Sequence, residues 1–195
     1  MAHNQQYFSV KWFSRLLFSF LLTLPLSGKS DQATLRCAQD LARQYKDYTY
    51  GSGSNKIDCV HFVLNVVECR LGESLPVNAR KAVLISYGWS AEETETKAKA
   101  GSDPKLGGVQ YALTTVLRKG KMIKPADAMP GDLVQYWMPK QNGEWFGHAA
   151  VISKVEGTMA TILGAHESAN AVTELKTPLN LVGTNRHLYI VRIEN

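Results

Sequence analysis

The order of local patterns along this chain constrains its fold most strongly, because helical periodicity gives way to short strand-like segments near residue 131. Asp31–Tyr48 and Asp58–Leu71 are each long enough for a helix, and their apolar residues recur at helical spacing. The β-branched content of Asp58–Leu71 leaves a buried strand open, but its length favours a helix ending at Gly72. Further short helices are expected at Pro76–Tyr87 and Gly108–Lys119, whereas Ser90–Gly101 is expected to be a solvated helix or a mobile insertion.

Strand-like segments, rich in β-branched and aromatic residues, follow the loop Lys124–Gly131. They are Asp132–Trp137, His148–Val155, Thr158–His166 and Leu188–Ile193. Helices followed by a run of strands predict an α+β fold, in which N-terminal helices pack on an antiparallel sheet. The chain of 195 residues suits one domain of ordinary size, and no linker divides residues 31–195.

The N-terminus differs from the rest of the chain. Met1–Ser30 contains three basic residues and no acid, and its apolar run Leu16–Leu26 is about half the ~20 residues that a spanning helix needs. Pro25 near the end of this run and the small residues after it are typical of a secretory signal peptide, cleaved after Ser30 or after Gly28. We therefore expect an exported protein, periplasmic or secreted, without a stable membrane span; an uncleaved anchor or a buried helix is the alternative.

The net charge gives no case for nucleic-acid binding. The formal charge is +5, from 22 Lys and Arg against 17 Asp and Glu. Three of the 22 basic residues, and none of the acids, lie in the predicted signal peptide, so the mature chain carries about +2. No dense run of Lys and Arg follows in the remaining chain.

Three cysteines follow the signal peptide, and an odd number in an exported protein predicts one disulfide and one free thiol. Cys59 and Cys69 cannot pair along one helix, where ten residues separate them by roughly 15 Å. Cys37 and Cys69 are therefore the candidate pair. Cys59 would begin a helix after a Gly/Ser loop, where unpaired amides and the helix dipole favour a thiolate and can hold an oxyanion. The alternative is a buried structural cysteine.

A nucleophilic thiol needs an imidazole base and a group that orients it. If a three-residue loop, Glu156–Thr158, joins two antiparallel strands, His148 faces His166 on one side of the sheet. A four-residue loop would place Glu167 opposite His148 instead, and a two-residue loop would turn His166 to the other face. Two unrelated histidines on a half-buried sheet remain the alternative. His61, two residues after Cys59, is expected to be structural or exposed.

The order of these pieces resembles the papain-like NlpC-type cell-wall cysteine peptidases and the related CHAP amidases. The similar stretches begin at Tyr50-Gly51, Asp58-Cys59, Pro130-Gly131-Asp132, Gly147-His148 and Gly164-Ala165-His166. The resemblance implies an NlpC fold and a thiol hydrolase that cuts amide bonds in peptidoglycan stem peptides. It implies Cys59 as nucleophile, His148 as base and His166 as orienting residue, with Tyr50 and Asp58 near the substrate. It implies no metal and no other cofactor.

The sequence also departs from the family. Val60-His61 replace a common Ser-Gly, Gly147 replaces a common Ser, and the segment 72–130 is longer than in minimal members. The preferred bond and the oligomeric state stay open. An acyltransferase or amidase acting on another substrate is one alternative, and a non-catalytic exported binding module is another.

Overall fold

The computed structural model describes residues 32–84, 107–139, 145–180 and 187–194, with the single positions 96 and 142. The predicted signal peptide, Met1–Ser30, lies outside the described residues, as does Ser90–Gly101 apart from position 96. A search of the described residues finds no helix with the length and apolar character needed to span a membrane.

Two N-terminal helices form the layer that carries the candidate nucleophile. α1 (Gln32–Gln44) ends four residues before the predicted Tyr48, where the chain turns. α2 (Cys59–Leu71) begins and ends as predicted, because the Asp58 side chain caps its first turn and Gly72 adopts a left-handed φ of 70° at its end.

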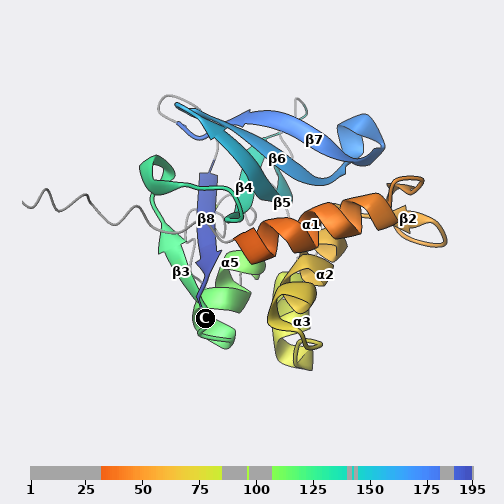
Figure 1. Cartoon of the computed structure of the whole chain (residues 1–195), viewed down its shortest axis with the longest axis horizontal. Coiled ribbons are helices and arrows are strands. Elements are labelled where there is room, and N and C mark those ends of the chain that lie inside the picture. Colours follow the sequence, from red (N-terminus) through yellow and green to blue (C-terminus); the bar gives the residue numbers. More distant parts are fainter. Residues whose placement is uncertain are drawn as a thin grey trace, which may run out of the picture.

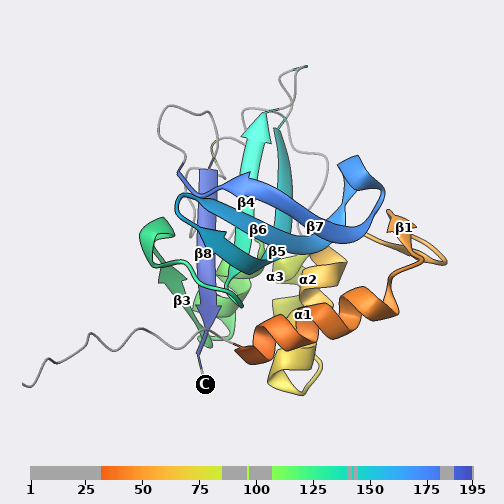
Figure 2. The same ribbon diagram turned by 45° about the horizontal axis from the view of Figure 1, so that its top comes forward.

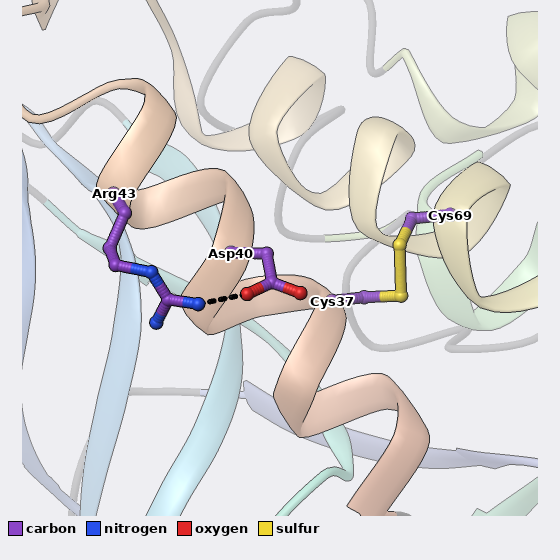
Figure 3. The surroundings of a disulfide bond; sticks show 4 residues. All are labelled: Cys37, Asp40, Arg43 and Cys69. Atoms are coloured by element: carbon purple, nitrogen blue, oxygen red, sulfur yellow. Dashed lines mark hydrogen bonds and ion pairs between the residues drawn. A yellow bond between two sulfur atoms is a disulfide. The ribbon is translucent and has the colours of Figure 1, made fainter.

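A disulfide joins these two helices (Figure 3). Cys37 of α1 and Cys69 of α2 pair with their Cα atoms 5.9 Å apart, which confirms the predicted partners and leaves Cys59 free. On the surface of α1, one turn beyond Cys37, Arg43 forms an ion pair with Asp40. The disulfide therefore fixes the far end of the helix on which Cys59 is the first residue.

The remaining helical segments are shorter than predicted. α3 (Val77–Val83) occupies the first part of the segment Pro76–Tyr87, whose end lies outside the described residues. The predicted helix Gly108–Lys119 consists of one α-helical turn, α5 (Val109–Tyr111), that continues as the π-helix Ala112–Val116. A short 3-10 turn, Pro125–Asp127, interrupts the predicted loop Lys124–Gly131, which joins the first two strands of the sheet in chain order.

A six-stranded antiparallel sheet follows, in the order β3-β8-β4-β5-β6-β7. Its strands are β3 (Gly120–Ile123), β4 (Leu133–Pro139), β5 (Trp145–Glu156), β6 (Met159–His166), β7 (Ala171–Pro178) and β8 (His187–Ile193). Helices α1 and α2 lie on one side of this sheet (Figure 1). The predicted α+β fold, with N-terminal helices packed on an antiparallel sheet, is thus confirmed.

The edge strands β3 and β7 were not predicted, and neither was a small parallel pair, β1 (Thr49–Tyr50) with β2 (Lys56–Ile57). In β7, exposed Glu174 and Lys176 dilute the apolar signal, as is common where an edge must resist pairing with other chains. A 3-10 turn, Glu167–Ala169, joins β6 to β7.

The two faces of the sheet belong to different clusters of buried side chains. Ala149 and Val151 of β5 pack with the apolar residues of α2, whereas Ala150 and Ile152 pack in a second cluster on the opposite face. This alternation follows from the pleat of the strand. It means that His148 shares the face of Ala150, away from the helices.

Candidate functional site

Cys59 stands at the first position of α2 and is only 1% exposed. It is the free cysteine of the chain, and the hydroxyl of Tyr50 donates a hydrogen bond to its sulfur at 3.7 Å. The sulfur also accepts a hydrogen bond from the backbone of Ala149 on β5. The helix start thus brings the thiol into contact with both the Tyr50 strand and the residue that follows His148.

The Ala149 amide can donate to the sulfur because of the direction in which the backbone groups of β5 point. Ile152 exchanges its backbone hydrogen bonds with the chain that enters β4, since its N–H donates to Asp132 and its carbonyl accepts from Gly131, each at 2.8 Å. Such bonds alternate in direction along a strand, so the backbone of Ala149 points the other way, toward β6.

The paired residues of β5 and β6 run from Glu156↔Met159 to Val151↔Leu163, and Ala149 lies beyond this last pair. There the Cys59 sulfur is the acceptor of the Ala149 backbone hydrogen bond. The thiol therefore lies beside β5 at the open end of the β5–β6 ladder.

Burial raises the pKa of the Cys59 thiol above its ordinary value, and the charge of Asp58 acts in the same direction. Hydrogen bonds from Ala149, from Tyr50 and from the amide of Cys59 itself oppose the rise without cancelling it. The amide at the helix start acts in the predicted direction, toward the thiolate, but the loss of water around the sulfur outweighs all the donors that face it.

His148 and His166 lie together, with ring centroids 4.7 Å apart and planes at 28°. Tyr136 on β4, directly opposite His148, packs against the other side of that imidazole at 5.2 Å. Glu167, the alternative third residue, begins the exposed turn after β6. The structure thus brings the two predicted imidazoles into one stack, and Tyr136 is a member of it that sequence reasoning missed.

The register that joins the two histidines arises differently from the predicted three-residue loop. At the turn Val155 pairs with Ala160, the register that would place Glu167 opposite His148. A β-bulge at Ser153 then shifts the pairing by one residue, so that Val151 faces Leu163. The same count, carried beyond this last pair, places His148 opposite His166, in agreement with their stacked rings. The predicted loop is therefore wrong, but the bulge restores the predicted partner.

Burial lowers the pKa of His148 to about 3, and repulsion from His166 adds to this shift. Burial also lowers the pKa of His166, against hydrogen bonds to the backbone that raise it. Both Nε2 atoms are buried and lack a hydrogen-bond partner within the described part of the chain. The pair is consequently a stack of neutral imidazoles, each with a ring nitrogen available for a proton or a donor.

The recorded contacts of His148 are with Tyr136 and His166, while those of the Cys59 sulfur are with Tyr50 and Ala149. The imidazole and the sulfur therefore approach the same stretch of β5, from its outer face and from its open edge. No hydrogen bond between them is recorded among the described residues.

Asp58 is occupied by its own helix. Its carboxylate accepts hydrogen bonds from the amide and from Nδ1 of His61, each at 2.8 Å. His61 is half-exposed, as expected, and its amide is committed to this cap. Among the first three amides of α2, those of Cys59 and Val60 are the ones left to face an oxyanion.

One neighbour, Trp137, accounts for a departure from the family that the sequence resembles. Trp137 packs over Gly147 on the helix-facing side, where a side chain at position 147 would place its Cβ 2.9 Å from the indole ring. The Ser that the family commonly has at this position would therefore collide with Trp137.

Within the described ranges, no group of three or more His, Cys, Asp or Glu side chains is arranged to hold a metal ion.

No protein-family model matches this chain, and no curated protein matches it. Among solved structures, an N-acetylmuramoyl-L-alanine amidase from Bacteroides uniformis ATCC 8492 is similar over 83% of this chain and 99% of its own. Its sequence identity is 12% and its TM-score is 0.42. At these values the similarity carries no argument about what this chain does.

Proposed function

We propose that this chain is an exported thiol hydrolase that cleaves amide bonds in peptidoglycan stem peptides, with Cys59 as its nucleophile. One observation carries the proposal: the free thiol begins a helix and lies at the open end of the β5–β6 ladder, where His148 and His166 stack. A nucleophile at a helix start, a base beside it and a group that orients the base form the constellation of thiol acyl transfer.

The resting charges favour general-base catalysis over a preformed thiolate. With the pKa of Cys59 raised and the pKa of His148 lowered, both groups are neutral near pH 7. The proton of the thiol passes to His148 as the sulfur attacks the amide carbonyl and the S–C bond forms. The amides of Cys59 and Val60 hold the oxyanion.

His148 then donates its proton to the leaving amine, and the C–N bond breaks to give a thioester on Cys59. Water, deprotonated by His148, attacks this thioester and releases the acid, and the sulfur regains its proton. His166 orients His148 through their stacked rings. Tyr50 holds the sulfur at the open edge of the sheet through its hydroxyl.

Proton transfer requires the imidazole within about 2.6–3.2 Å of its partner, or one water away. Such contacts are commonly longer in free enzymes and tighten when substrate binds. His148 is the chain neighbour of Ala149, whose backbone donates a hydrogen bond to the sulfur, and the proposal requires the His148 ring to reach the thiol when substrate binds.

The substrate class rests on the resemblance of the ordered stretches around Tyr50, Cys59, Asp132, His148 and His166 to cell-wall peptidases. Export is supported by the signal-like N-terminus and by the Cys37–Cys69 disulfide, since such bonds persist in oxidising compartments. Asp58 contributes by capping α2, and a contact with substrate at the helix start remains its predicted role.

The test is digestion of purified peptidoglycan by the mature chain, with the released fragments identified by mass spectrometry. We expect release of stem-peptide fragments, and loss of at least 10³-fold in rate for Cys59→Ala and for His148→Ala. His187→Ala, which changes a histidine at the start of another strand, is the matched control and should retain activity. Release by folded Cys59→Ala would remove the nucleophile and the proposal with it.

A second arm addresses acyl transfer, which the same thiol and imidazole can perform. Adding a free amino-acid amine as acceptor would divert the thioester into a new amide, visible as a mass increase in the product. Hydrolysis alone predicts the unmodified acid.

A further inference from the structure

We propose that Asn170 is a positioning residue of the site: its side chain holds Tyr50 so that the Tyr50 hydroxyl reaches the sulfur of Cys59. This inference deepens the proposed function, since it assigns a role in arranging the same thiol. Asn170 lies on the turn between β6 and β7, and 120 positions separate it from Tyr50 in the sequence.

The first observation is the contact itself. The Oδ1 atom of Asn170 accepts a hydrogen bond from the backbone N–H of Tyr50 at 3.1 Å. Asn170 adopts a left-handed φ of 49°, and its own N–H closes the turn onto Glu167 at 3.1 Å. Asn is among the few residues that tolerate this conformation, and it also carries the side-chain acceptor that the contact needs.

The second observation is the pattern of backbone hydrogen bonds around Tyr50, in the two-stranded sheet of β1 and β2. The neighbouring amides of Thr49 and Gly51 donate to Asn55 and Ile57, in and next to β2, at 3.1 and 3.2 Å. Because backbone bonds alternate in direction, the Tyr50 amide points away from β2. Asn170 supplies the acceptor there, so that β1, only two residues long, is held from both sides.

The third observation is where this link leads. Asn170 follows His166 by four residues, and Tyr50 contacts the sulfur of Cys59 at 3.7 Å. In Figure 2 the turn between β6 and β7 lies beside β1, in agreement with the contacts between β1 and β7. The hydrogen bond from Tyr50 to the Asn170 side chain therefore connects the turn after His166 to the tyrosine that contacts the thiol.

The test reads the thiol without any substrate. Cys59 is the free cysteine, so the rate of its alkylation by iodoacetamide, followed by mass spectrometry across pH, reports its ionisation in the full chain. The Tyr50 hydroxyl favours the thiolate, so Tyr50→Phe should move the midpoint upward by roughly half to one pH unit. Asn170→Gly, which keeps the left-handed backbone and removes the acceptor, should move it in the same direction.

The double variant distinguishes positioning from a general loss of stability. If Asn170 acts through Tyr50, Asn170→Gly adds no further shift in the Tyr50→Phe background. Asn55→Gly is the matched control, because Asn55 also has a left-handed φ, of 55°, and its recorded hydrogen bond uses only its backbone carbonyl. That control should leave the midpoint unchanged. An unchanged midpoint in Asn170→Gly, or shifts that add in the double variant, would overturn the proposal.

A second measurement covers the case of a thiol too slow to titrate. Hydrogen exchange of the Tyr50 amide should accelerate in Asn170→Gly and stay protected in Asn55→Gly, and equal protection in both would count against the proposal. Neither readout depends on peptidoglycan. If digestion fails while the alkylation shift appears, the proposed function is lost and the positioning role of Asn170 stands. If digestion succeeds while the alkylation midpoint does not shift, the proposed function stands and the positioning role is lost.

Discussion

The imidazole rings of His148 and His166 stack with their centroids 4.7 Å apart, although the residues next to the turn between β5 and β6 pair in a different register. The bulge at Ser153 shifts the pairing of β5 with β6 by one residue. Beside it, the Ser153 hydroxyl donates a hydrogen bond to the carbonyl of Thr161 at 3.2 Å. The pair thus depends on an irregularity several residues from either histidine.

The buried His148 should make stability depend on pH. The pKa of His148 is about 3 in the folded state and 6.5 in the unfolded state. Between these pH values the imidazole is protonated in the unfolded chain and neutral in the folded chain. The free energy of unfolding therefore falls as pH drops from 6.5 toward 3. One such group contributes up to about 1.4 kcal/mol per pH unit, and His166 acts in the same direction.

Urea unfolding of the wild type and of His148→Gln between pH 5 and 6.5 measures this effect above the range where carboxylates titrate. We expect the free energy of unfolding to change less steeply with pH in the variant than in the wild type, whatever the absolute stability of the variant. Equal slopes would show that the imidazole is not shielded from water as the structure has it.

The Cys37–Cys69 disulfide should contribute substantially to stability, because it closes a loop with a sequence separation of 32 residues. Loops of this length predict roughly 2–4 kcal/mol through restriction of the unfolded chain. The double variant Cys37→Ala/Cys69→Ala should lose about that much in denaturant unfolding. As a check on the pairing, thiol titration of the denatured, unreduced wild type should find one reactive group.

The ion pair between Asp132 and Arg192 should be the costliest to break among those described here. Asp132 is fully buried, accepts from Nε and Nη2 of Arg192 at 2.6 and 2.9 Å, and also accepts from the amide of Met129. Asp132→Asn removes the charge of this fully buried carboxylate from the Arg192 guanidinium, whose side chain is 19% exposed, at an expected cost of about 3 kcal/mol.

Glu73→Gln is the matched control for that experiment, since Glu73 pairs with Lys119 where both side chains are largely in solvent. Its expected cost is at most ~1 kcal/mol. Similar losses in the two variants would contradict the assignment of Asp132 as the buried anchor that ties the start of β4 to β8.

Gly147→Ser should destabilise the protein even though the family it resembles commonly has Ser there. The new Cβ would lie 2.9 Å from the Trp137 ring, and overpacking of this kind costs typically ~1–3 kcal/mol. Trp137→Leu should relieve most of that penalty. A double-mutant cycle measured by thermal unfolding tests this, and additive effects would exclude the proposed clash.

Much of the helical layer could be predicted from the sequence because its signals are local. Asp58 and Gly72 mark the ends of α2 by cap chemistry, and the arithmetic of three cysteines left few pairings. The strand β7 was missed because charged residues on an exposed edge mask its alternation.

The site was harder to predict, for a physical reason. The bulge at Ser153 changes the register without a turn residue or a glycine to mark it. Likewise, the raised pKa of Cys59 results from burial by segments distant in sequence, which a helix-start motif cannot report. Local chemistry indicated which residues matter, whereas their ionisation depends on the packed environment.

The hydrogen bond from Ala149 to the Cys59 sulfur offers a built-in reporter of chemistry at the thiol. Once the sulfur carries an acyl or alkyl group, its lone pairs are poorer acceptors and the attached carbon crowds the edge of β5. The amide resonance of Ala149 should then move in an NMR spectrum, so modification of Cys59 can be followed from the backbone without a chromogenic group.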